Sequence, residues 1–207
     1  MENVHLIHHP VLAHSLTLLR DRRTGTEEFR RHAAIVAQIV LLEATRTLPV
    51  KKKTVRTPLA SIQGGQLTED LVLVPVLRAG LSLLNAALDI LPGTPVGFIG
   101  LERDERTALA RTYYQKFPLE LKHKHVIVLD PMLATGGSLI DTVARLYDRG
   151  VQDICAACVV AAPEGIAALH KSYTEVLIYT AAIDSHLDET KYIVPGLGDF
   201  GDRYFGT

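Results

Sequence analysis

Short apolar runs alternate with amphipathic stretches through most of the chain. Five runs have the length and apolar character of buried strands, and we predict strands at Leu71–Val76, Val96–Leu101, Val126–Leu129, Ile154–Val160 and Val176–Thr180. Apolar positions at helical spacing predict helices between them, at Leu81–Ile90, Ser138–Asp148 and Glu164–Lys171. Buried strands that alternate with helices are typical of an α/β fold, in which a parallel twisted sheet is flanked by helices.

Two segments lie outside this alternation. We expect a further helix over Glu27–Thr45, on the N-terminal side of the sheet. Residues 51–68 are mostly polar and include Pro58, Gly64 and Gly65, so we expect a hairpin arm there. A chain of 207 residues has the size of one domain, and we expect residues 1–207 to form a single domain.

The composition narrows the class of protein. Apolar residues make up 47% of the chain, charged residues make up 22%, and the net charge is −1, so no basic excess predicts a nucleic-acid partner. No apolar run approaches the roughly 18 residues of a membrane span, so we expect no membrane partner. The N-terminus lacks the pattern of a signal peptide, and we expect the protein in the cytoplasm.

The segment from Val126 to Ser138 is the strongest candidate for a binding site. An apolar run leads into Asp130, then into Thr135-Gly136-Gly137-Ser138, and a predicted helix follows. The N–H groups of such a loop and the adjoining helix N-terminus favour a bound anion, and glycine lets the backbone approach a phosphate closely. An acid at the strand end can accept hydrogen bonds from sugar hydroxyls, so the pattern suggests a ribose 5-phosphate. Neither dinucleotide-binding nor Walker A spacing is present.

Arginines follow two of the other predicted strands. Arg78 comes directly after Leu71–Val76, where a guanidinium can bind an oxyanion through two hydrogen bonds. Arg103 follows Val96–Leu101 within a run of mixed charge, and it could serve a second phosphate, although such runs are usually solvated. Tyr113–Lys116 lies downstream in the same long connection, and long polar connections at a ligand site often act as lids.

The stretch from Tyr192 to Arg203 is the third candidate. Pro195 with glycines at 196, 198 and 201 prescribes a specific backbone path. We expect an irregular loop whose main-chain groups can read the polar edge of a flat ring, although a terminal turn without a ligand has a similar composition.

Other polar or reactive residues suggest no site. Cys155 and Cys158 lie within a predicted strand, where their side chains point to opposite faces, so we interpret them as core residues. The histidines at 5, 8, 9 and 14 lack the spacing of a metal site.

The loop Asp130–Ser138 resembles the phosphoribosyl pyrophosphate (PRPP) loop of the type I phosphoribosyltransferases. The sequence of this loop, with Pro131 after a single acidic residue, is similar to that of the uracil phosphoribosyltransferase family. The likeness runs nearly end to end, through His9-Pro10, His14, Leu16, Glu43–Arg46, Thr57–Leu59, Leu77–Leu81, Tyr114–Lys116, Ala161–Ile166, Pro195–Asp199 and Phe205–Thr207. It implies a phosphoribosyltransferase core, a small hood built from the N- and C-terminal segments, and an arm at about residues 51–68.

The resemblance also implies an activity, the transfer of the phosphoribosyl group from PRPP to uracil, giving UMP and pyrophosphate in pyrimidine salvage. The residues that it assigns to PRPP are Arg78, Arg103, Asp130, Pro131, Met132, Leu133, Ala134, Thr135, Gly136, Gly137, Ser138 and Asp199. Those that it assigns to uracil, largely through main chain, are Ile193, Gly198, Asp199 and Phe200. Mg²⁺ would arrive bound to PRPP, with no metal site in the protein, and the pattern names no general base.

The resemblance further implies a homo-oligomer, a dimer or larger, with the arm reaching across, and GTP as an effector, since GTP activates some relatives. Phe200 stands where the family usually has alanine, and its side chain would narrow the base pocket if it pointed inward. Ser82, Asn85, Ala86 and Leu42 also depart from the pattern, as does the lack of a proline before Tyr113. Two alternatives stay open: a regulator on the same fold that binds pyrimidine-operon messenger RNA, and a transferase for another base, such as a purine. The near-neutral net charge counts against an RNA-binding regulator. The run Pro195–Asp199 counts against a transferase for another base.

Overall fold

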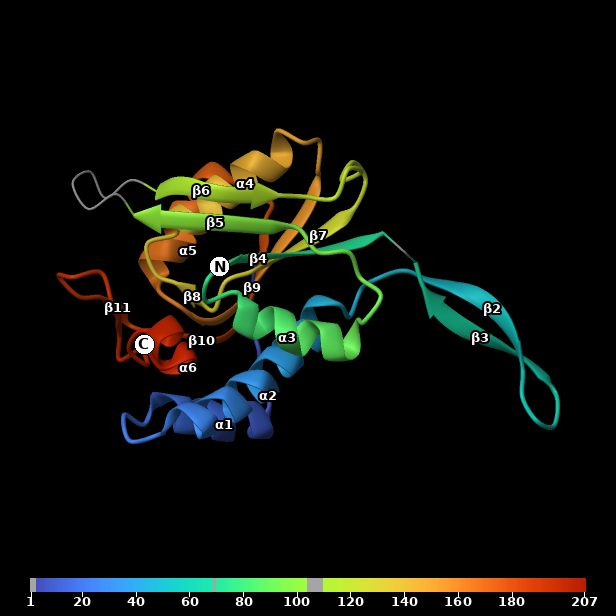
Figure 1. Cartoon of the computed structure of the whole chain (residues 1–207), viewed down its shortest axis with the longest axis horizontal. Coiled ribbons are helices and arrows are strands. Elements are labelled where there is room, and N and C mark those ends of the chain that lie inside the picture. Colours follow the sequence, from blue (N-terminus) through green and yellow to red (C-terminus); the bar gives the residue numbers. More distant parts are fainter. Residues whose placement is uncertain (1–2, 69, 104–109) are drawn as a thin grey trace.

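A central sheet runs through the computed structural model, which describes residues 3–68, 70–103 and 110–207 (Figure 1). The strand order is β1-β10-β9-β7-β4-β5-β6, with β8 paired to β9. All neighbouring strands are parallel except β5 and β6, which are antiparallel. The bounds are β1 Val4–Leu6, β4 Leu71–Leu77, β5 Phe98–Arg103, β6 Ala110–Lys116, β7 His125–Leu129, β8 Met132–Leu133, β9 Asp153–Ala161 and β10 Leu177–Ile183.

Helices cover both faces of this sheet (Figure 1). Helices α1 to α3 lie on one face and α4 and α5 on the other, and each face has its own apolar cluster. Alternate residues of the strands supply the two clusters, so that Cys155 belongs to one and Cys158 to the other. The helices are α1 Pro10–Arg20, α2 Thr26–Ala44, α3 Leu81–Ile90, α4 Gly137–Tyr147, α5 Pro163–Ser172 and α6 Phe200–Phe205.

The arm predicted at residues 51–68 is an antiparallel hairpin of β2 (Val50–Arg56) and β3 (Ser61–Leu67). It extends away from the rest of the chain (Figure 1). Every residue of β2 is exposed, and Leu59 at the turn is 97% exposed. The arm therefore adds little to the core of a single chain.

The sequence interpretation was wrong about Tyr113–Lys116. These residues form most of β6, and Tyr114 to Lys116 pair with β5 in antiparallel register, with Tyr113 at an irregularity in the pairing. They therefore belong to the sheet and not to an irregular connection. Tyr113 and Tyr114 are about half exposed because β6 is an edge strand. An exposed edge strand with polar residues has no apolar run, so the sequence pattern indicated a loop. The lid interpretation otherwise concerned residues 104–109, which lie outside the described residues.

The structure also contains elements that the apolar pattern did not predict. Helix α1 begins with Pro10 at its first turn, and His9 caps it by accepting a hydrogen bond from the N–H of Val11 through its Nδ1 (3.2 Å). The stretch from Tyr192 to Arg203 is only partly irregular, because β12 (Ile193–Val194) pairs with β11 (His186–Leu187) and α6 begins at Phe200. No helix among the described residues has the length and apolar character that crossing a membrane requires.

Candidate functional site

The phosphate loop, which we define as residues 130–138, runs from the end of β7 through β8 into the first turn of α4. Its start is fixed by two hydrogen bonds: the N–H of Asp130 donates to the carbonyl of Ala157 (3.2 Å), and the N–H of Met132 donates to Asp130 Oδ1 (3.3 Å). Gly136, with φ +83°, turns the chain into α4 in a left-handed conformation that favours glycine. The loop encloses a cradle of about 30 Å³, lined by Asp130, Met132, Leu133, Ala134, Thr135, Gly136, Gly137, Ser138 and Leu139.

The other side of this loop rests directly on the first turn of α5. A Cβ on Gly165 would lie 2.3 Å from the carbonyl oxygen of Ala134 and 2.9 Å from that of Leu133. A Cβ on Gly136 would lie 2.9 Å from the carbonyl oxygen of Gly165. The two backbones are therefore in contact at glycines, and this contact limits where the backbone of the phosphate loop can lie.

Arg78 follows β4 and stands beside the cradle at the same edge of the sheet. The turn behind it is tight, because a Cβ on Gly80 would lie 2.4 Å from the carbonyl oxygen of Leu129. The side chain of Arg78 is 62% exposed, and its Nη2 lies 3.7 Å from Asp202 Oδ1 on α6. A long, exposed ion pair of this kind contributes little to stability, so the guanidinium is available to a ligand.

A larger cleft, of about 480 Å³, adjoins the cradle. Met132 and Ala134 line both, so the two hollows adjoin at these residues. The cleft brings the phosphate loop together with Arg78, the β11–β12 hairpin and the C-terminal segment, and its lining residues are Arg78, Ala79, Met132, Ala134, Thr190, Lys191, Tyr192, Ile193, Gly198, Asp199, Phe200, Gly201 and Asp202.

The C-terminal wall of the cleft is the base loop, which we define as residues 195–199. Gly196 (φ +58°) and Gly198 (φ +80°) adopt left-handed conformations. Within the described residues, no hydrogen bond of the protein occupies the N–H or the carbonyl of Gly198, which is exposed. These two main-chain groups are consequently available to a ligand in the cleft.

Asp199 and Phe200 have structural contacts of their own. Asp199 caps α6, since its Oδ1 accepts from the N–H of Asp202 (2.8 Å). Phe200 is 1% exposed, and its ring packs edge to face on Phe29 at 5.1 Å and stacks on Tyr204 at 6.2 Å. The aromatic side chain is thus held in the core behind the wall of the cleft.

The hairpin of β11 and β12 contributes residues that sequence reasoning missed. Asp188 Oδ1 accepts from the N–H groups of Thr190 (2.9 Å) and Tyr192 (2.8 Å), and the bond from Tyr192 contributes most to a lowered pKa of the Asp188 carboxyl. The turn places Thr190 and Lys191 on the cleft, Lys191 with φ +70°. The one sequence signal for this turn is Asp188, because an aspartate often binds the main-chain N–H two residues later in the chain.

Two predicted residues are not placed at the site. Arg103 is the last residue of β5, but its side chain lies outside the described part of the chain. Pro131 lines neither the cradle nor the cleft, and its carbonyl instead accepts from the N–H groups of Val159 (2.9 Å) and Val160 (3.0 Å) of β9. Their assignment to PRPP stays a prediction.

Comparisons with known proteins agree with this geometry. The family model described as uracil phosphoribosyltransferase matches residues 6–207. A protein of Dictyoglomus thermophilum named uracil phosphoribosyltransferase is 48% identical to this chain over 98% of both sequences. A protein of Campylobacter concisus with the same name is 44% identical over 100% of both sequences. The solved structure of an Aquifex aeolicus protein superposes with a TM-score of 0.93 at 36% identity, covering 99% of this chain and 98% of that one. Because the agreement extends through the whole chain and not only through the phosphate loop, the chain belongs to the uracil phosphoribosyltransferase family, whose members are pentosyltransferases of the type I phosphoribosyltransferase fold.

Proposed function

We propose that phosphoribosyl transfer from PRPP to uracil takes place in the cleft, with the 5-phosphate in the cradle and uracil against the base loop. The observation that carries this proposal is that the cradle and the cleft share Met132 and Ala134 in their linings. In this proposal, a sugar phosphate held by residues 130–138 turns its C1 side toward the cleft, where the base lies against Gly198. This is the reaction of the family to which the chain belongs.

Each part of the site has a physical role in the proposal. The N–H groups at the start of α4 bind the 5-phosphate, aided by the helix dipole. Arg78 stabilises the negative charge that develops on pyrophosphate as the C1–O bond breaks and uracil N1 attacks from the opposite face, with the N1 proton released to solvent as the N1–C1 bond forms. The remaining contribution is the positioning of the two reactants.

The base loop accounts for selection of uracil over cytosine. We assign recognition to main-chain groups of Ile193 and Gly198 to Phe200, with Gly198 presenting both a donor and an acceptor. Uracil offers an N3–H donor and a carbonyl acceptor, whereas cytosine offers an unprotonated N3 and an amine. Cytosine would leave protein groups unpaired in the site, which is a strong basis for rejection.

Mg²⁺ enters the proposal as the companion of PRPP. Asp130 in the cradle and Asp199 and Asp202 at the cleft supply carboxylate oxygens, the donors that Mg²⁺ prefers. The ion is proposed to arrive already bound to PRPP, because Mg²⁺ gives up its water ligands reluctantly and is usually held by one or two carboxylates together with substrate phosphates. When bound, the ion would neutralise charge on the pyrophosphate group.

We also propose that the chain acts as a homo-oligomer, and that the whole of residues 1–207 is one domain with a hood built from its ends. Apolar side chains on the projecting arm support the first part, since Val50, Leu59 and Ile62 are 59%, 97% and 57% exposed. Light scattering should give a mass of at least two chains, and Leu59→Ser should weaken the association. From the sequence we also propose a cytoplasmic location, which cell fractionation tests. From the family resemblance we propose activation by GTP, which is tested by measuring the reaction rate with and without GTP.

A substrate panel tests the activity. Purified protein is incubated with PRPP, Mg²⁺ and one free base at a time, and nucleotide and pyrophosphate are measured. We expect UMP and pyrophosphate in equal amounts from uracil, and no product from cytosine or a purine. Turnover of a purine in preference to uracil, or no turnover of any base, would refute the proposal.

A further inference from the structure

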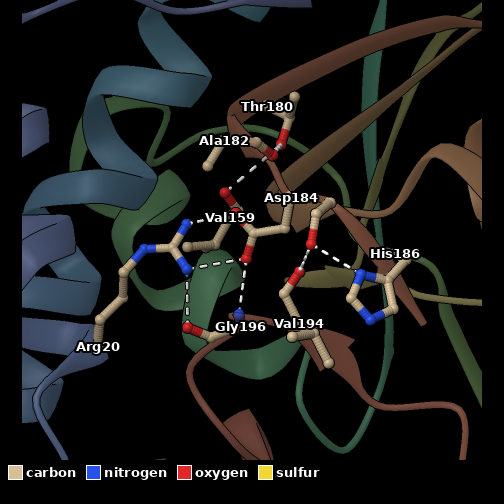
Figure 2. Close-up of polar contacts among 9 residues, drawn as sticks. Arg20, Val159, Thr180, Ala182, Asp184, His186, Val194 and Gly196 are labelled. Carbon is tan, nitrogen blue, oxygen red and sulfur yellow. Dashed lines mark hydrogen bonds and ion pairs between the residues drawn. The ribbon is translucent and has the colours of Figure 1, made fainter. Parts of the chain in front are cut away.

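The base loop is tied at its start to an ion pair between distant parts of the chain (Figure 2). Arg20 on α1 contacts Asp184 after β10 through two hydrogen bonds, from Nη2 to Oδ1 at 2.6 Å and from Nη1 to Oδ2 at 2.8 Å. Both groups also bind Gly196: its N–H donates to Asp184 Oδ2 (2.8 Å), and its carbonyl accepts from Arg20 Nη1 (2.7 Å). The pair therefore satisfies both main-chain polar groups of one loop residue.

Gly196 is also fixed from its other side. Its φ is +58°, and a Cβ there would lie 2.1 Å from the carbonyl oxygen of Ile193. Ser185, next to Asp184, donates from its N–H (2.9 Å) and its Oγ (2.7 Å) to the carbonyl of Val194. The entry to the base loop thus has one backbone path, and the ion pair determines where that path lies.

A second anchor ties the middle of the base loop, at Leu197, to the same helix. Arg203 of α6 donates to the carbonyl oxygens of Leu197 and Asp21, each at 2.7 Å, and to that of Leu19. Its guanidinium lies 4.5 Å from the centroid of the Phe29 ring. Both anchors, at Gly196 and at Leu197, therefore lead to the C-terminal end of α1, and Gly198 follows directly after them.

We propose that Arg20 and Asp184 are positioning residues for the base, which hold the main chain of the base loop against α1 and so set the affinity for uracil. They act through Gly196, and neither lines the cleft. The inference rests on the proposed function, since it assigns uracil to the base loop. An ion pair whose Asp184 side chain is only 5% exposed is costly to desolvate and is weak evidence of a stabilising role, whereas it orients its partners narrowly.

Steady-state kinetics with separate titrations of uracil and PRPP test this inference. Arg20→Met keeps the length of the side chain but removes all three hydrogen bonds that Arg20 donates to Asp184 and Gly196. We expect the KM for uracil to rise about 10- to 100-fold, because the loop loses its register, while the KM for PRPP changes by less than about threefold. Arg20→Lys keeps the positive charge but loses the planar guanidinium that donates two parallel hydrogen bonds. Its KM for uracil should lie between those of Arg20→Met and the wild type.

Arg23→Met is the matched control. Arg23 follows the same helix and its side chain is 84% exposed. Among the residues that the structure describes, that side chain binds only the carboxylate of Asp21, so both KM values should equal those of the wild type. If Arg20→Met does not fold, Arg20→Lys and Asp184→Asn are judged by the same criterion, and failure of all three to fold would assign the pair to stability and overturn the inference. So would an unchanged KM for uracil, or equal rises for uracil and PRPP. A wild-type protein that makes no UMP would refute the proposed function instead.

Discussion

Gly165→Ala tests whether the contact between α5 and the phosphate loop sets the geometry of the cradle. The new Cβ would lie 2.3 Å from the carbonyl oxygen of Ala134, whereas an ordinary carbon–oxygen contact is about 3.3 Å or longer. The difference is about 1 Å, and it must be met by movement of backbone on one side or the other, because no flexible side chain is involved.

The energetic consequences have opposite signs. Alanine is a better helix former than glycine by about 0.5–1 kcal/mol, while forced overpacking costs about 1–3 kcal/mol, so we expect a net loss of about 1–2 kcal/mol in the free energy of unfolding. A displacement of about 1 Å at a site that positions reactants can cost about 100-fold, and we expect kcat/KM for PRPP to fall by about that factor. Activity should therefore fall much more than stability.

Urea denaturation and initial rates measure the two effects on the same preparation. Gly93→Ala is the control, because a Cβ there meets nothing within 4 Å and lies away from the cleft. The control should keep the wild-type activity and stability. The reasoning would be refuted by a Gly165→Ala enzyme with wild-type kcat/KM for PRPP, since the loop would then not depend on this contact.

Three further predictions follow from the site and the core. Arg78→Ala should lower kcat by about 100-fold or more with the unfolding curve unchanged, because the guanidinium is mostly exposed and acts on the leaving group; full activity would contradict its assignment. Glu164 accepts from the N–H of Leu187 (2.9 Å), which lowers its pKa from 4.5, so its contribution to stability is complete above pH 4.5 and is lost as the pH falls through the lowered value. The difference in unfolding free energy between wild type and Glu164→Gln should be constant from pH 7 to 5 and shrink below pH 4.5; a constant difference down to pH 3 would contradict this. Burial raises the pKa of both Cys155 and Cys158, so the native protein should not react with thiol reagents until urea unfolds it, and rapid labelling without urea would show the core to be more open than described.

Most of the sheet could be predicted from the sequence because its signals are local. Six of the seven residues of β4 are buried and apolar, and α3 matches its predicted bounds of Leu81–Ile90. The phosphate loop was also readable, since Gly136 is needed for a left-handed turn and the helix that follows has a strong apolar period. Strand β6 was missed because its half-exposed edge carries polar residues, so neither an apolar run nor a regular alternation marked it.

The sequence by itself therefore determined the separate segments that carry the chemistry. These are a phosphate loop after one buried strand, an arginine after a second buried strand, and a glycine-rich loop near the C-terminus. Only the tertiary structure decided how these parts meet. Arg20 and Asp184 are 164 residues apart in the sequence, and no periodic pattern pairs them, yet together they hold both polar groups of Gly196. Local propensity acts over a few residues, whereas the packing of α1 against the end of β10 brings this ion pair together and places the base loop beside the phosphate loop.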